Sequence, residues 1–91
     1  MMSDLRKELE ESNPEATVFD GLDDAITALA EGRDGTIAVY DMDKIIEIFM
    51  ARDGMTEEDA VEFVSYNVVR TLPYMGALAP VIIYQKAKTE I

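Results

Sequence analysis

Two apolar runs of strand character frame the second half of the chain. Residues 36–40 are apolar on both faces of a pleated strand, a pattern typical of a central strand that is covered on both sides. Residues 80–84 are also apolar and predict a second strand. The pattern leaves open whether the two strands run parallel or antiparallel.

Two amphipathic helices are predicted between these strands. Their apolar faces comprise Met42, Ile45, Ile46, Phe49 and Met50 in the first helix, and Ala60, Val61, Val64 and Val68 in the second. Asp41 or Asp43 caps the first helix, and Gly54 ends it by supplying a left-handed residue. Thr56 caps the second helix, where the acidic residues that follow suit the positive end of the helix dipole.

The first third of the chain is less regular. A short helix is predicted over residues 5–11, because Leu5 and Leu9 share one helical face. Residues 22–31 fit two patterns. Their apolar positions have helical spacing, but a short glycine-containing loop also joins them to residues 36–40 as in a β-hairpin. Alanine is a weak strand former, so propensity alone favours the helix.

Composition excludes several classes of function. The chain has no cysteine and no histidine, so disulfides and thiolate metal sites are excluded and the commonest general base is missing. No apolar run approaches the ~20 residues that span a bilayer, and the first residues do not form a signal peptide. We therefore expect a cytoplasmic protein without a cofactor or a membrane partner.

The charge of the chain points to the kind of partner. The formal net charge is −11, from 19 acidic and 8 basic residues. Direct binding to nucleic acid is not expected, because neutralising phosphates needs clustered lysine and arginine. An acidic surface favours basic partners and speeds encounter with them, although solubility alone is the alternative explanation of such a charge.

One block of sequence resembles a known group of proteins. It comprises Tyr40-Asp41-x-Asp43-Lys44-x-Ile46-Glu47-Ile48-x-Met50, Asp53-Gly54-Met55-x-x-Glu58-Asp59-Ala60, Asn67-Val68 and Leu72-Pro73-Tyr74-Met75-Gly76. Over residues 20–84 the chain is similar to uncharacterised small proteins of bacteriophages and prophage-carrying bacteria. The resemblance implies a strand and a turn at residues 24–30, although these are richer in alanine here. It also implies a phage-borne context, in which small acidic proteins often bind host proteins, and it carries no activity.

With the hairpin that the resemblance favours, the elements predict an α+β fold. The predicted sheet has three strands, formed by a hairpin that includes residues 25–30 and by the C-terminal strand. Two helices pack on one face of it, and a short helix precedes it. The 91 residues form one domain, with an N-terminal helix and linker (residues 1–15), a core (20–84) and a tail (85–91).

Asp41 and Asp43 raise the question of catalysis. An Asp-x-Asp pair after a buried strand is where phosphotransfer enzymes of the haloacid dehalogenase type place a nucleophile and an acid, with magnesium on the phosphoryl group. Here Lys44 stands where a small or hydroxyl residue is expected, and a distal acidic pair is missing. Capping and first-turn roles at the helix start explain the pair better, so phosphoryl transfer stays a minor alternative.

The favoured hypothesis is a non-enzymatic binding protein with an acidic face. Glu57, Glu58 and Glu62, with Asp53 close by, concentrate charge along one helix, where they could imitate nucleic-acid phosphates in the groove of a basic host protein. Asp20, Asp23 and Asp24 would extend this strip if they lay on the same side. The alternative is self-association through Tyr74 and Met75, if the turn that carries them exposes an apolar knob.

Overall fold

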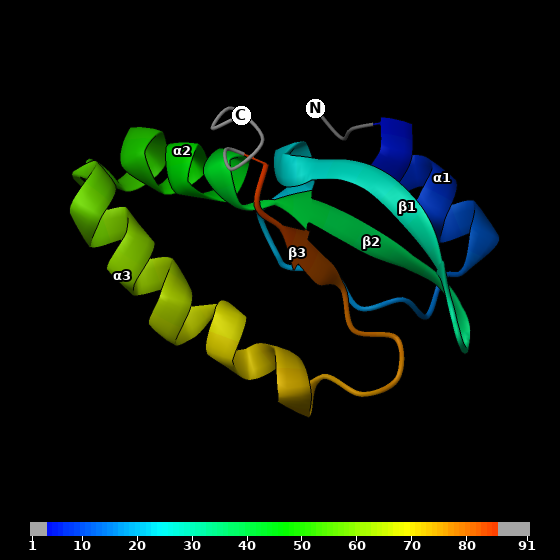
Figure 1. Cartoon of the computed structure of the whole chain (residues 1–91). Coiled ribbons are helices and arrows are strands. Elements are labelled where there is room, and N and C mark those ends of the chain that lie inside the picture. Colours follow the sequence, from blue (N-terminus) through cyan, green and yellow to red (C-terminus); the bar gives the residue numbers. More distant parts are fainter. Residues whose placement is uncertain (1–3, 86–91) are drawn as a thin grey trace, which may run out of the picture.

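The structure is a computed structural model, and it describes residues 4–85. Its elements follow the chain in the order shown in Figure 1. They are α1 (Asp4–Ser12), the 3₁₀ helix η1 (Asp23–Ala25), β1 (Ile26–Gly32), β2 (Gly35–Asp41), α2 (Met42–Asp53), α3 (Glu57–Asn67), the 3₁₀ helix η2 (Val69–Tyr74) and β3 (Val81–Ile83). The predicted α+β class is confirmed. The tail assigned to residues 85–91 lies, beyond Gln85, outside the described residues.

The three strands form a mixed sheet in the order β1-β2-β3. β1 and β2 pair antiparallel, and β2 and β3 pair parallel. The parallel pair requires a crossover connection, which α2, α3 and η2 provide between β2 and β3. The predicted strand at residues 36–40 is therefore central, as expected, while the last strand is shorter than predicted.

Residues 26–32 form a strand, although residue propensity alone predicted a helix there. β1 pairs with β2 from Ile26 opposite Tyr40 to Gly32 opposite Gly35, with an irregularity between Ile26 and Ala28. Pairing with a buried neighbour outweighs the weak strand preference of alanine, because strand preference depends mostly on packing and burial. Gly35, whose φ is 143°, also lies close to Asn13, so that a Cβ there would come within 2.9 Å of the Asn13 Nδ2 atom.

One hydrophobic core joins all the layers. Tyr40 of β2 is completely buried among side chains from α1, α2 and α3, such as Leu9, Ile45 and Val64. The Tyr40 hydroxyl accepts a hydrogen bond of 2.9 Å from the backbone N–H of Phe19, and the two rings lie 4.9 Å apart. The segment before β1 is thus fixed to the central strand, and α1 belongs to the same core as the residues from 20 onward.

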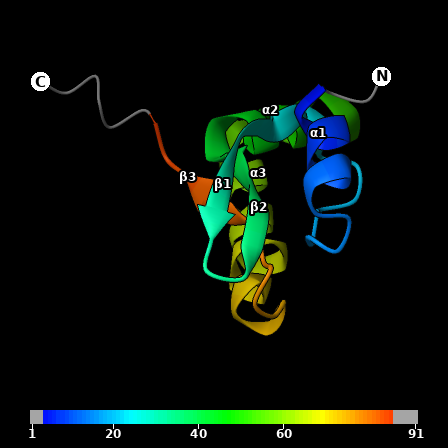
Figure 2. The ribbon, with the colours of Figure 1, turned by 90° about the vertical axis from the view of Figure 1, so that its right-hand side faces the viewer.

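In the part of the chain that the structure describes, helices cover one face of β2 only, although Val39 on the other face is buried between its neighbouring strands. Ala38 and Tyr40 face the core, whereas Val39 lies outside the core cluster on the opposite face. Figure 1 looks onto that opposite face, and Figure 2 shows α1 on the other side of the sheet. The helices supply one layer only, so one apolar sheet face remains open.

Replacing Tyr40 by phenylalanine tests the bond between the central strand and the preceding segment. Tyr40→Phe keeps the ring but leaves the buried N–H of Phe19 without its acceptor. We expect a loss of about 1–3 kcal/mol in the free energy of unfolding, measured by urea denaturation. Phe19→Leu, which alters the ring contact and keeps the backbone bond, is the comparison; an unchanged stability of Tyr40→Phe would contradict the assigned role.

The same hydroxyl predicts a dependence on alkaline pH. Burial raises the pKa of Tyr40 above its ordinary value of 10.0, and the bond from Phe19 opposes this only in part. The contribution of the neutral phenol is therefore complete below pH 10.0 and is lost as the pH rises from there through the folded-state pKa. The stability difference between the wild type and Tyr40→Phe should shrink above about pH 10. A stability difference between the wild type and Tyr40→Phe that stays constant in urea denaturation up to about pH 11 would contradict this role of the Tyr40 hydroxyl.

Candidate acidic interaction surface

Helix α3 packs against the rest of the molecule through a narrow apolar stripe. Ala60 and Val64 are buried, as is Val68 immediately after the helix. Eight of the eleven residues of α3 are exposed, so this helix presents most of its circumference to solvent. The Thr56 Oγ1 atom accepts a hydrogen bond of 3.1 Å from the Asp59 N–H at its start. The cap and the acidic first turn fix where the glutamates project.

Three shallow hollows run together across α2 and α3. The first is lined by Glu57, Glu58, Asp59, Val61 and Glu62, the second by Asp43, Ile46, Glu47, Met50 and Glu57, and the third by Asp24, Lys44, Glu47, Ile48 and Ala51. Glu57 is shared by the first two, and Glu47 by the last two. We call this continuous region the acidic surface. Its lining is mostly carboxylates, with Lys44 and several apolar side chains between them.

The acids of this surface form no ion pair within the described part of the chain, although Lys44 lines the third hollow beside Asp24 and Glu47. The ion pairs found there lie elsewhere: Arg6 with Glu10 and Asp23, and Arg52 with its neighbour Asp53. None of them involves a carboxylate that lines the three hollows. The negative charge on the outer side of α2 and α3 therefore stays available to a partner.

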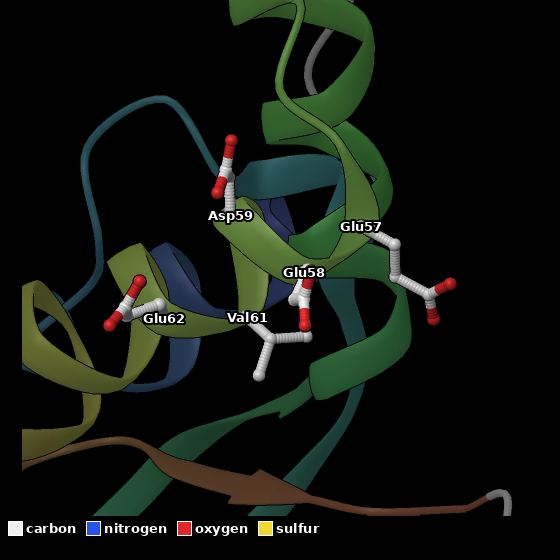
Figure 3. Close-up of a pocket in the computed structure, with 5 residues that line it drawn as sticks. All are labelled: Glu57, Glu58, Asp59, Val61 and Glu62. Carbon is white, nitrogen blue, oxygen red and sulfur yellow. The ribbon is translucent and has the colours of Figure 1, made fainter.

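The carboxylates of α3 do not converge on a point. Figure 3 shows those of Glu57, Asp59 and Glu62 directed away from one another around the first turn of the helix. Among residues 4–85 there is no group of three acidic side chains that could hold a metal ion. The geometry suits a broad, basic surface better than a single cation.

Asp41 and Asp43 have separate positions at the start of α2. Asp41 is only 7% exposed, and both of its oxygens accept hydrogen bonds, Oδ1 from the Asp43 N–H and Oδ2 from the Gln85 side chain, each at 2.9 Å. Asp41 is thus the helix cap, and Asp43 lies in the first turn and lines the second hollow. A buried carboxylate with both oxygens engaged is badly placed for nucleophilic attack, which speaks against phosphoryl transfer.

The structure brings together only some of the residues predicted to bind. Glu57, Glu58 and Glu62 line one hollow, while Asp53 lies near them in sequence but lines none of the three. Tyr74 is 88% exposed, whereas Met75 packs partly against the core. The expected knob is therefore a single tyrosine.

Other members of the acidic surface were missed or misplaced by pattern. Asp24 does extend the strip, whereas Asp23 is paired with Arg6. Met50 and Val61 were assigned to core faces, yet they are 37% and 39% exposed. The apolar stripes of these helices are wider than the part that the small core buries. Periodicity alone does not show how much of a stripe is buried.

Comparison with known proteins gives no relative. No family model, no curated protein and no solved structure matches the chain. Within residues 4–85, no helix has the length and apolar character needed to cross a membrane.

The two helix caps should differ in their contribution to stability. Thr56→Ala removes one exposed cap bond and should cost about 1 kcal/mol. Asp41→Ala removes a buried cap and the acceptor of Gln85, so we expect about 2 kcal/mol or more by urea denaturation. Asp41→Asn keeps one carbonyl oxygen as the cap acceptor and should recover part of the loss; equal effects of both alanine variants would argue against the second role of Asp41.

Proposed function

We propose that this chain is a non-enzymatic binding protein that engages a basic protein through the acidic surface. The observation that carries this proposal is the group of hollow-lining carboxylates on α2 and α3 that form no ion pair within the described residues. Apart from the dipole contribution of the first-turn acids of α3, such a concentration of like charge costs stability, because the charges repel one another. A basic partner would relieve that repulsion.

The apolar lining residues add buried area to the binding surface, which charge alone does not provide. Complementary charge mainly increases the rate of encounter and selects the partner, whereas buried apolar area slows dissociation. Met50 and Val61 lie in the same hollows as Glu47 and Glu62, so a partner that carries both basic and apolar groups would contact both kinds of side chain. This combination favours a specific binding surface over a solubility device.

The resemblance to phage and prophage proteins suggests the source of the partner. In that setting the basic partner would be a host protein, and a nucleic-acid-binding groove is the basic surface that spaced carboxylates would imitate. The divergent carboxylates of α3 support this reading, because phosphates along a nucleic acid are likewise spread over a surface instead of meeting at a point.

The test is a pull-down from host lysate with tagged wild type and a triple variant, Glu57→Gln, Glu58→Gln and Glu62→Gln. We expect a retained basic protein with the wild type at low salt, less of it at high salt, and about tenfold less with the variant, because three complementary charges are lost. Mass spectrometry names the retained protein, and its affinity is then measured with the purified pair.

The control separates a site from net charge. The variant Glu8→Gln, Glu11→Gln and Glu15→Gln removes the same charge from exposed positions in and after α1. It should bind as the wild type does. If both triple variants lose binding equally, the chain attracts basic proteins through its overall charge and has no binding site on α2 and α3.

A further inference from the structure

The open face of the sheet is apolar along all three strands. Side chains that alternate with the core-facing ones point to this side, and strand register places them beside one another. They are Ala28 and Ala30 on β1, Ile37 and Val39 on β2, and Val81 and Ile83 on β3. Val81 is 41% exposed, while Val39, between the flanking strands, is covered by its neighbours. An open sheet face normally carries polar residues, so an apolar one indicates an interface.

Among the described strand residues, none on this face carries an exposed charge. Asp41 is the one ionisable residue of β2 on this side of the sheet, and it is buried with both oxygens bonded. The helices, by contrast, carry acids over their outer surfaces, and the net charge is −11. Two copies of the chain would repel wherever their helices met. The open sheet face is a place where they can meet without bringing carboxylates together.

We infer that the open sheet face binds a second copy of this chain. The sequence that follows the described residues, 86–91, contains only Ala87 and Ile91 as apolar residues, too few to match six neighbouring apolar side chains. A basic partner of the kind proposed above is drawn to the acidic surface by charge, and the open sheet face offers it no such attraction. A second copy offers an identical apolar, uncharged face, which is what a two-fold symmetric contact requires.

The contact would be a sandwich of two sheets about 10 Å apart. Strands of seven, seven and three residues offer about 300 Å² of sheet, at about 4.8 Å between strands and about 3.3 Å per residue. Stable complexes bury about 800 Å² per partner, so the dimer is weak and forms at micromolar or higher concentration. Because α1 lies on the far side of the sheet, such a dimer keeps this helix outward (Figure 2). The contact also uses none of the residues that line the acidic surface. The inference therefore does not depend on the proposed function.

Sedimentation equilibrium over a range of concentrations tests the dimer with two matched variants. Val81→Glu places a charge on the open face, and Val61→Glu places the same charge on α3 at nearly equal exposure, 41% and 39% respectively. The wild type should approach twice its mass of 10.2 kDa. Val61→Glu should do the same, and Val81→Glu should dimerise at least about tenfold more weakly. Circular dichroism checks that each variant is folded.

A dilution series of two-dimensional amide NMR spectra gives the same answer without substitution. On dilution, signals of Ala28, Ala30 and Ile37 should shift, while those of Glu58 and Glu62 should not. A wild type that stays at 10.2 kDa up to about 1 mM overturns the inference. So does a dimer that Val81→Glu leaves intact, or one whose dilution shifts fall on the helices.

Discussion

The central position of β2 is the constraint on which the rest of the structure depends. Its apolar residues on both faces make it costly at an edge, so it needs a strand on each side. The hairpin supplies β1 directly, but a parallel partner can come only from a crossover. That crossover fixes the path of α2 and α3, and the carboxyl end of β2 delivers Asp41 to the position where it caps α2.

A thin core explains why the helices expose so much of their surface. A domain of 91 residues buries a small fraction of its area, and α3 contributes the stripe of Ala60 and Val64, followed by Val68, with Phe63 against the ring of Phe49. The rest of its circumference is free to be selected for contacts with other molecules. The acidic first turn stabilises the helix through its dipole and at the same time concentrates charge at one end of the surface. In the proposed function, the same residues would serve both the stability of the helix and recognition.

Much of this fold follows from sequence, and the failures have physical causes. The central strand, both capped helices and the C-terminal strand follow from periodicity and capping, which are local signals. At residues 22–31 local propensity favoured a helix, whereas pairing with a distant strand favoured a strand. The outcome depended on burial in the folded protein, which a local sequence pattern does not show. The surface roles of Met50 and Val61 depend on how much area the core covers, and the burial of Met75 depends on where η2 meets the other helices. The strip of Glu57, Glu58 and Glu62 was visible because its members lie within six consecutive residues of one predicted helix.

The apolar pattern of β2 predicts packing on both faces of the strand, and the single chain provides helices on only one. Residues 36–40 are apolar on both faces, yet in residues 4–85 the helices lie on one face only. A strand with two apolar faces in a fold that packs helices on one of them leaves apolar surface exposed in the single chain. An uncharged face opposite acidic helices divides the molecule into a side suited to its own copy and a side suited to a basic protein. In a dimer joined by the sheets both acidic surfaces would lie outside the contact, and two binding sites on one particle would raise the apparent affinity for a partner that is itself repeated.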